Sequence, residues 1–214
     1  MRITEIYQSI QGETAQAGRL CTLVRTTGCD LRCSWCDTPH AFFGGREMSV
    51  DQILAAVAEL APRLVLLTGG EPLLQLELPQ LAEALLGRGY EVMCETGGAH
   101  DVAVLPAGVR RIVDCKAPGS GETGRMLWAN FEGGRLEPGR DAVKFVLRDE
   151  RDYEWARDVM ARYRLAEQCE VLLSPVHGEL DPRALIAWML RDRLPARLNL
   201  QIHKYVWGKD AQGV

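Results

Sequence analysis

Short apolar, β-branched runs alternate along the chain with segments of helical periodicity, and this alternation predicts βα units around a parallel sheet. A complete barrel of eight such units needs about 250 residues. The chain has 214 residues, so we expect an α/β fold with an open, partial βα barrel of about six or seven strands. We expect it to form one domain over residues 1–214. The predicted strands are Leu20–Thr26, Leu64–Thr68, Tyr90–Glu95, Arg111–Cys115, Ala142–Leu147, Glu170–Leu173 and Arg197–Ile202.

Signals for helix ends are few, and they predict a barrel that is reduced in helices. Ser49 and Gln52 form a capping box ahead of the apolar run 53–58, and prolines suited to a first turn open two more helices. Residues 96–110 leave little room for a full helix, and residues 118–138 are Gly-rich and irregular. The predicted helices are 53–58, Leu81–Leu86 behind Pro79, Glu150–Tyr163, and Ala184–Leu190 behind Asp181-Pro182.

Composition and charge exclude several classes of protein. Hydrophobic residues make up 47% and charged residues 25% of the chain, which are ordinary globular values and disfavour a disordered or coiled-coil protein. The net charge is −4 without a block of Lys and Arg, so we expect no direct contact with nucleic acid. No apolar run approaches the roughly 20 residues that span a bilayer, and the first residues do not form a signal peptide. We therefore expect a soluble, cytoplasmic protein without a membrane partner.

Three of the seven cysteines are clustered. Cys29, Cys33 and Cys36 lie within eight residues, in a C-x₃-C-x₂-C pattern directly after the first predicted strand. In a reducing compartment such clustering indicates metal or redox chemistry. Zinc structural sites and ferredoxin clusters usually have four protein ligands, so three thiolates leave one position for another ligand. A Cys₃His zinc site with His40 is the alternative. The other cysteines lie singly in apolar stretches and are expected to be buried; they are Cys21, Cys94, Cys115 and Cys169.

Polar residues follow the predicted strands at their carboxyl ends, where the active sites of βα barrels assemble. The glycine pair Gly69-Gly70 lets the backbone approach a ligand closely, and the carboxylate of Glu71 can hold a cationic amine. Any one of these segments could be a turn or a cap, but their common register with the strands predicts one active site. The segments are Thr68–Pro72, Glu95–Gly98, Asp114–Pro118, Lys144, Ser174–His177 and His203-Lys204.

The cysteine pattern and the glycine pair together resemble the radical S-adenosylmethionine (SAM) superfamily. The resemblance rests on the C-x₃-C-x₂-C segment, with Trp35 before its last cysteine, followed by Gly69-Gly70-Glu71-Pro72. It implies that Cys29, Cys33 and Cys36 ligate a [4Fe–4S] cluster whose open iron binds SAM, and that reduction of SAM releases a 5′-deoxyadenosyl radical. It also implies that the Gly-Gly-Glu turn contacts the methionine part of SAM and that Trp35 lies near its adenine.

Further segments narrow the resemblance to the 7-carboxy-7-deazaguanine synthases. This family converts 6-carboxy-5,6,7,8-tetrahydropterin to 7-carboxy-7-deazaguanine with loss of ammonia, on the route to queuosine and related 7-deazapurines. The resemblance implies a carbon–nitrogen lyase that works as a homodimer with an external reductant such as flavodoxin or ferredoxin. A small radical SAM activase that acts on a protein is the neighbouring alternative. The segments are Ile10–Glu13, Val24–Asp30, Cys36–Thr38, Glu95–Gly98 and Leu200–Lys204.

The same resemblance implies which residues contact the substrate and a Mg²⁺ ion. Arg25 offers a planar fork that suits a substrate carboxylate, with an ion pair to Glu13 as the alternative. Thr38 matches a Mg²⁺ position, while Asp37 is either a ligand or a brace for the loop. His203 matches a substrate position but could also be a structural histidine. The implied substrate contacts are Ile10, Gln11, Gly12, Glu13, Arg25, Thr96 and His203.

Contacts with SAM are implied beyond the Gly-Gly-Glu turn. Related proteins often have Ser-Pro-Lys where this chain has Asp114-Cys115-Lys116, so the match is firmest at Lys116. The chain end, residues 207–214, can approach the substrate in this family. The implied SAM contacts are Trp35, Gly69, Gly70, Glu71, Gly98, Asp114, Cys115, Lys116, Ser174, Pro175, Val176 and His177.

Overall fold

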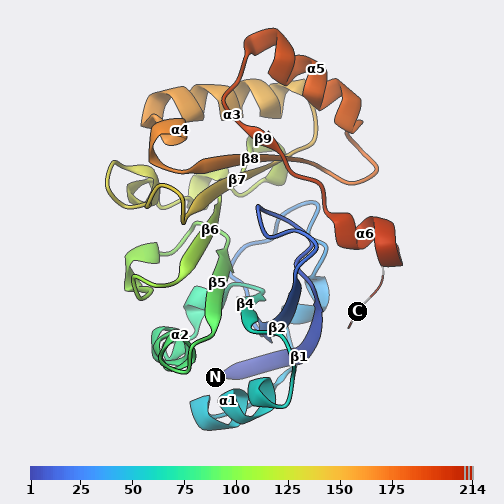
Figure 1. Cartoon of the computed structure of the whole chain (residues 1–214). Coiled ribbons are helices and arrows are strands. Elements are labelled where there is room, and N and C mark those ends of the chain that lie inside the picture. Colours follow the sequence, from blue (N-terminus) through green and yellow to red (C-terminus); the bar gives the residue numbers. More distant parts are fainter. Residues whose placement is uncertain (210, 212, 214) are drawn as a thin grey trace.

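A nine-stranded sheet forms the centre of the computed structural model (Figure 1), which describes residues 1–209, 211 and 213. The strands lie in the order β3-β1-β2-β4-β5-β6-β7-β8-β9. From β2 onward neighbouring strands are parallel, and β1 and β3 add an antiparallel edge. The sheet does not close, so the predicted open, partial barrel is confirmed. The strands are β1 (Arg2–Ile10), β2 (Leu20–Thr26), β3 (Arg46–Glu47), β4 (Leu64–Gly69), β5 (Glu91–Thr96), β6 (Arg110–Asp114), β7 (Ala142–Leu147), β8 (Glu170–Pro175) and β9 (Arg197–Leu198).

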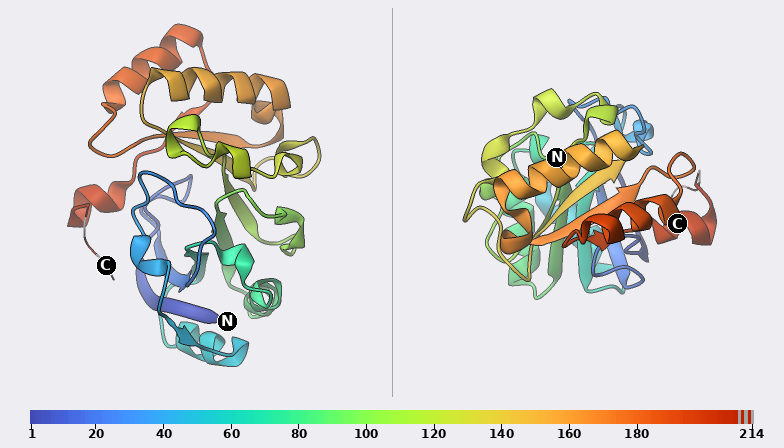
Figure 2. Two further views of the ribbon diagram at one scale, coloured as in Figure 1. Left: turned by 180° about the vertical axis from the view of Figure 1, so that it is seen from behind. Right: turned by 90° about the horizontal axis from the view of Figure 1, so that it is seen from above.

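Helices cover the outer face of this sheet in two groups. Seen from behind, α1 and α2 lie over the N-terminal strands, and α3 and α5 lie over β7 and β8 (Figure 2). The capping box at α1 is confirmed, since Ser49 Oγ accepts from Gln52 N and Gln52 Oε1 accepts from Ser49 N. A single 3₁₀ turn, Val102–Val104, joins β5 to β6 in place of a helix. The helices are α1 (Val50–Ala58), α2 (Leu78–Gly87), α3 (Glu150–Tyr163), α4 (Leu165–Gln168), α5 (Pro182–Asp192) and α6 (Ile202–Trp207).

The parallel strands β2 and β4 to β8 carry apolar side chains on both faces, because successive residues point to opposite sides of the sheet. On β4, Val65 and Leu67 pack outward beneath α1 and α2, whereas Leu64 and Leu66 belong to a smaller apolar cluster on the inner face. A third cluster joins β7 and β8 to α3 and α5. The four singly placed cysteines are buried as predicted. The inner face of the parallel strands therefore has an apolar middle, formed by residues such as Leu66 and Met93.

The last predicted strand, Arg197–Ile202, is wrong beyond Leu198. β9 ends there, and Ile202 begins α6, so His203 lies on a helix. The physical reason is a set of contacts with the first residues after β1. Asn199 Oδ1 accepts from Thr14 N at 2.7 Å, and Ile202 N donates to Gly12 O at 2.9 Å. These bonds turn the chain away from β8 and lay α6 against the carboxyl edge of the sheet.

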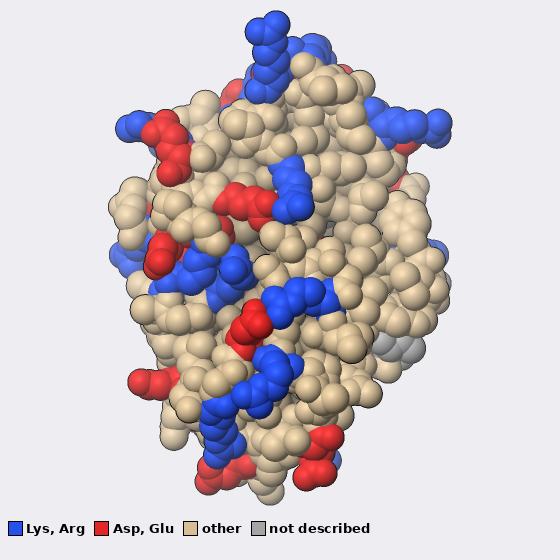
Figure 3. All heavy atoms as spheres, in the orientation of Figure 1, with Lys and Arg blue, Asp and Glu red and all other residues tan. Residues whose placement is uncertain are grey.

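Strand β1 is absent from the sequence-based prediction. Most of its residues are only half-buried, so it lacks the clean alternation that marks a strand with one buried face. The predicted ends of β5 and β6 each differ by one residue from those in the structure, so Cys115 lies just beyond β6. Lys, Arg, Asp and Glu are interspersed over the face seen in Figure 3. Among the described residues, no helix combines the length and apolar character needed to cross a bilayer.

Candidate active site

A chamber of about 660 Å³ opens at the carboxyl ends of the parallel strands. The segment after β1, the loop after β2, the ends of β4 to β7 and the helix α6 all contribute to its lining. Sequence positions from 5 to 213 therefore meet at one place. The predicted site residues that line it are Ile10, Gln11, Gly12, Glu13, Arg25, Cys29, Cys33, Trp35, Cys36, Thr38, Gly69, Gly70, Thr96, Asp114, Lys116, Val176, His177 and His203. Those that lie outside its lining are Glu71, Gly98, Cys115, Ser174 and Pro175.

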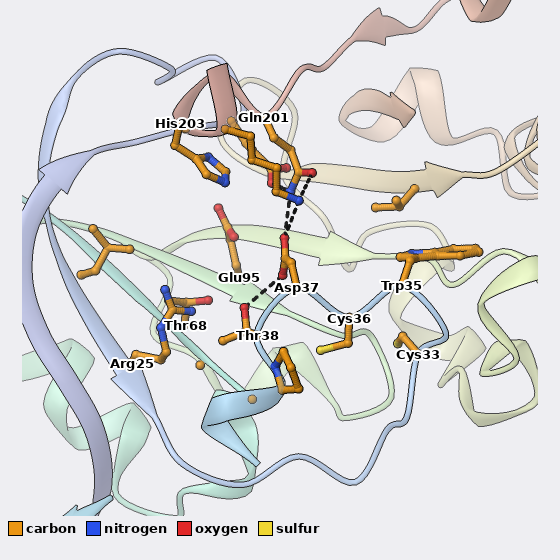
Figure 4. Close-up of a pocket in the computed structure, with 18 of the residues that line it drawn as sticks. Arg25, Cys33, Trp35, Cys36, Asp37, Thr38, Thr68, Glu95, Gln201 and His203 are labelled. Atoms are coloured by element: carbon orange, nitrogen blue, oxygen red, sulfur yellow. Dashed lines mark hydrogen bonds and ion pairs between the residues drawn. The ribbon is translucent and has the colours of Figure 1, made fainter. Parts of the chain in front are cut away.

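The loop after β2, residues 27–45 and here called the cysteine loop, brings its three thiols to the chamber (Figure 4). Gly28 has φ +99° and starts the loop. Its carbonyl accepts from Glu71 N at 2.8 Å, and a Cβ on Gly70 would lie 2.2 Å from the same oxygen. The Gly-Gly pair is therefore required for the turn after β4 to pack against the cysteine loop. Burial raises the pKa of each of the three thiols.

Glu71 supports this turn from behind. It is fully buried and accepts hydrogen bonds from Leu73 N at 2.9 Å, Thr96 Oγ1 at 2.8 Å and Gly97 N at 2.7 Å. Burial raises the pKa of its carboxyl group. With three donors already in place, the carboxylate joins the end of β4 to the end of β5. Gly98 has a related role, because with φ +80° a Cβ there would lie 2.3 Å from Asp114 O.

Four charged side chains form a continuous row along the chamber, here called the ion-pair wall: Glu13, Lys144, Asp114 and Lys116. Lys144 Nζ lies 2.9 Å from Glu13 Oε2 and 3.3 Å from Asp114 Oδ1, and Lys116 Nζ lies 2.6 Å from Asp114 Oδ2. Burial alone would raise the pKa of the Asp114 carboxyl group, but the two lysines hold it below its ordinary value. Mutual pairing is what makes burial of such charges tolerable.

Glu13 is held on both of its oxygens. Besides Lys144, Oε2 accepts from Asn199 Nδ2 at 3.0 Å, and Oε1 accepts from Gln201 Nε2 at 2.8 Å. Asn199 Nδ2 also donates to Ser174 Oγ at 2.8 Å, which places Ser174 behind the chamber. The predicted alternative, an ion pair between Glu13 and Arg25, is wrong because Glu13 is paired with Lys144.

Arg25 is held by β1 instead. Its Nε donates to Glu5 Oε1 at 2.6 Å, and its Nη2 lies 3.4 Å from Tyr7 Oη. These contacts fix the plane of the guanidinium group while the side chain lines the chamber. His40 Nε2 lies 3.6 Å from the same Glu5 oxygen. His40 therefore faces β1, which disfavours a zinc site completed by this histidine.

Asp37 braces the cysteine loop against α6 (Figure 4). Its Oδ1 accepts from Thr38 Oγ1 at 3.0 Å, and its Oδ2 lies 2.9 Å from Lys204 Nζ and 3.2 Å from Gln201 Nε2. Of the two predicted roles of Asp37, the structure thus favours the brace. His203, on the same helix, covers Gly12 so closely that a Cβ there would lie 1.9 Å from its Nδ1. Burial lowers the pKa of His203.

Sequence reasoning placed Lys144 at the active site without a specific role, and it assigned no role there to Glu5, Tyr7 and Asn199. The signal for Lys144 was present, since a lysine interrupts an apolar strand. Glu5 and Tyr7 lie on the strand that the prediction lacks, and Asn199 follows a strand that was predicted to continue. These residues hold predicted site residues in position, so their roles can be recognised only from their contacts in the structure.

The chamber at the carboxyl edge of an open βα barrel and the three-cysteine loop that borders it agree with a radical SAM enzyme, the class that comparisons with known proteins show. Residues 23–116 match the family model of the radical SAM superfamily. The crystal structure of QueE from Escherichia coli superposes with a TM-score of 0.77 at 24% identity, covering 94% of this chain and 93% of that one.

Relatives along the full length define the family. A 7-carboxy-7-deazaguanine synthase of Koribacter versatilis is 44% identical over 229 residues, covering 100% of both chains. Another, from Chlorobaculum tepidum, is 44% identical over 214 residues, covering 100% of this chain and 97% of the relative. The chain belongs to the 7-carboxy-7-deazaguanine synthase family.

Membership implies a [4Fe–4S] cluster and SAM, and the thiol arrangement fits them. Cys29, Cys33 and Cys36 are free and all line the chamber. Among the described residues, no three His, Cys, Asp or Glu side chains are gathered as a single metal ion requires. A cluster of several irons takes one thiolate per iron, so its cysteines need not converge on one point. The donor set therefore suits a cluster better than a single zinc ion.

Proposed function

We propose that the chamber binds 6-carboxy-5,6,7,8-tetrahydropterin and contracts its ring to 7-carboxy-7-deazaguanine with loss of ammonia, in the biosynthesis of queuosine and related 7-deazapurines. The chain is a radical SAM carbon–nitrogen lyase. The observation that carries the proposal is that three free thiols and a guanidinium group suited to a carboxylate line one chamber of about 660 Å³. This volume lies in the ordinary range for small-molecule sites.

The cofactor side of the chamber is assigned to the cysteine loop. The cluster held by Cys29, Cys33 and Cys36, together with SAM, supplies hydrogen-atom abstraction from the substrate when both are bound. Gly69 and Gly70 line the chamber next to the cysteine loop, so we assign contact with the methionine part of SAM to this turn. Trp35, a residue of the same loop, lines the chamber and offers an aromatic face to the adenine.

The remaining predicted SAM contacts divide by position. Asp114 and Lys116 line the chamber as an ion pair, and Val176 and His177 line it after β8. We assign direct contact with SAM to these residues. Gly98, Cys115, Ser174 and Pro175, together with Glu71, lie behind the lining, where they shape the turns that carry the direct contacts.

The substrate side is assigned to Arg25, Thr96 and the residues after β1. Arg25 binds the substrate carboxylate in the bidentate manner that its planar fork favours. The Ile10–Glu13 segment and His203 enclose the heterocycle, and α6 restricts the access of water from that side. Thr38 supplies a hydroxyl ligand to a Mg²⁺ ion whose other ligands are water and substrate oxygens.

The wider setting follows from the chemistry of the site. We propose that residues 1–214 form a single radical SAM domain that works as a homodimer. An external one-electron donor such as flavodoxin or ferredoxin reduces the cluster. Three clustered, unpaired cysteines require a reducing compartment, which supports a cytoplasmic enzyme.

Anaerobic reconstitution tests the proposed function. The protein is loaded with iron and sulfide, then given SAM, dithionite and carboxytetrahydropterin, and the deazaguanine product is followed by its absorbance and mass. We expect a brown preparation that forms product and releases ammonia. A colourless protein with one bound zinc ion, or a brown protein that consumes SAM without using the pterin, would contradict the proposal.

A further inference from the structure

Glu95 differs from the other carboxylates that line the chamber. Each of the others has a cationic side chain at about 3 Å or less: the pairs are Glu5–Arg25 at 2.6 Å, Glu13–Lys144 at 2.9 Å, Asp37–Lys204 at 2.9 Å, Asp114–Lys116 at 2.6 Å and Glu179–Arg148 at 3.0 Å. In the described part of the chain, no Lys, Arg or His nitrogen lies within 4 Å of the Glu95 carboxylate. Among the described residues, Glu95 is thus the chamber carboxylate that has no cation in direct contact.

The position of Glu95 directs this carboxylate to a ligand. The residue lies near the end of β5, in the middle of the sheet, and lines the chamber (Figure 4). Gln11 Nε2 donates to Oε1 at 3.1 Å. A carboxylate has about four acceptor sites, so Glu95 keeps most of its capacity for a guest. Gln11 in turn is fixed, because its Oε1 accepts from Glu13 N at 3.0 Å.

Glu13 is a poorer candidate for the same task. Its two oxygens already accept from Lys144, Asn199 and Gln201. A ligand that donated to Glu13 would have to compete with a buried lysine. The two glutamates therefore differ in their surroundings. Glu13 is a member of the ion-pair wall, whereas Glu95 is free to accept hydrogen bonds from a ligand.

We propose that Glu95 is a specificity-determining residue that accepts two N–H groups from the substrate, the ring N–H and the exocyclic amino group of its 2-aminopyrimidinone edge. This inference rests on the proposed function and adds the group that recognises the pterin edge opposite its carboxylate. Two parallel hydrogen bonds to one carboxylate give directional recognition. A ring with acceptors or no amino group at this edge leaves the carboxylate unpaired, which is why such sites discriminate strongly.

A pH dependence follows from the same placement. Burial raises the pKa of Glu95 to about 6, while Lys144 opposes the rise and Glu13 adds to it. The charged groups that face Glu95 are Lys144, Glu13 and Asp114. Protonation removes acceptor capacity, so affinity for the pterin should fall as the pH drops below about 6, and the same pterin should bind with full affinity above that value.

The test measures binding to the cluster-loaded enzyme with SAM present, under anaerobic conditions. Dissociation constants are determined for carboxytetrahydropterin and for its analogue without the 2-amino group, with the wild-type protein, Glu95→Gln and Glu91→Gln. We expect Glu95→Gln to weaken pterin binding roughly 100-fold and the analogue to bind the wild type with a similar loss. The two losses should not multiply when the analogue meets Glu95→Gln. Glu91, at the exposed start of the same strand and paired with Arg19, is the matched control and should bind like the wild type.

Four outcomes overturn the inference. Pterin binding by Glu95→Gln at wild-type strength is one, and losses that multiply in the double change are another. If Glu95→Gln does not fold, the wild-type protein still decides: the analogue, which keeps only the ring N–H, must show a smaller weakening near pH 6 than the pterin, and equal profiles would reject Glu95. If the wild type neither binds nor converts the pterin, the proposed function fails and this inference falls with it.

Discussion

The cysteine loop and the ion-pair wall border the same chamber, but they are built in opposite ways. The loop carries three thiols within eight residues, and these are free cysteines whose pKa values burial raises. The wall joins Glu13 to Lys144 across 131 positions of sequence, and each of its charges already has a partner. The loop is chemically incomplete without a guest, whereas the wall is satisfied by the protein alone.

The two regions should therefore respond differently to the loss of a side chain. Loss of a thiol should remove the cofactor and leave the fold intact, because the thiols contribute little to the packed core. Loss of a charge in the wall should affect the fold and the substrate together, because an unpaired buried charge is costly. Substitutions in the two regions therefore test whether the loop and the wall depend on their partners in these different ways.

The largest expected effect is that of Cys33→Ala in the loop. We expect the variant to fail to hold the cluster and to lose activity below detection, while its circular dichroism spectrum and melting temperature stay near those of the wild type. Iron analysis and absorbance after anaerobic reconstitution measure the first part. Cys21→Ala, at a buried cysteine of β2, is the control and should keep its iron. Full turnover by Cys33→Ala would refute the assignment of the loop.

Lys144→Met tests the wall. Removal of the lysine leaves Glu13 and Asp114 without a shared cation, so we expect the free energy of unfolding to fall by about 3–5 kcal/mol and pterin affinity to fall as well. Denaturant titration and equilibrium binding measure the two effects. Arg111→Met is the matched control, because Arg111 is equally buried but bonds to Leu105 O and Arg135 O away from the chamber. It should lose stability and keep pterin affinity; unchanged stability of Lys144→Met would contradict the role of the wall.

The contrast also explains how much could be predicted from the sequence. The cysteine loop and the Gly-Gly-Glu turn are local patterns that directly follow predicted strands, so their spacing and position placed them at the site. Most strands were found because their apolar runs are buried on both faces. Lys144 and Asn199 bind partners more than 130 positions away in the sequence. The residues that flank them in the sequence do not indicate those partners. The turn into α6 failed for the same reason, since contacts with Gly12 and Thr14 decide it.

Arg25 combines features of the two regions, because it is paired with Glu5, like the residues of the wall, and is also assigned to bind a ligand, like the loop. Arg25→Ala tests this assignment. We expect pterin binding to weaken by about 2–4 kcal/mol through loss of the carboxylate contact, with SAM binding unchanged. Equilibrium binding of both ligands to the cluster-loaded enzyme measures the split. Arg19→Ala removes an exposed ion pair with Glu91, which contributes at most about 1 kcal/mol to stability, and it serves as the control. Equal losses of pterin and SAM affinity would remove Arg25 from the substrate side.

The smallest expected effect is that of Thr38→Ala, where the cysteine loop meets α6 through Asp37 and Lys204. If Thr38 supplies a Mg²⁺ ligand, the variant should keep its cluster, its fold and its basal rate, and lose most of the stimulation of turnover by Mg²⁺. Thr38→Ser retains the hydroxyl group and should restore that stimulation, which separates ligation from packing of the methyl group. A Mg²⁺ titration of turnover measures both variants. An unaltered response in Thr38→Ala would show that Thr38 serves the loop only, through its hydrogen bond to Asp37, and that the ion has another ligand.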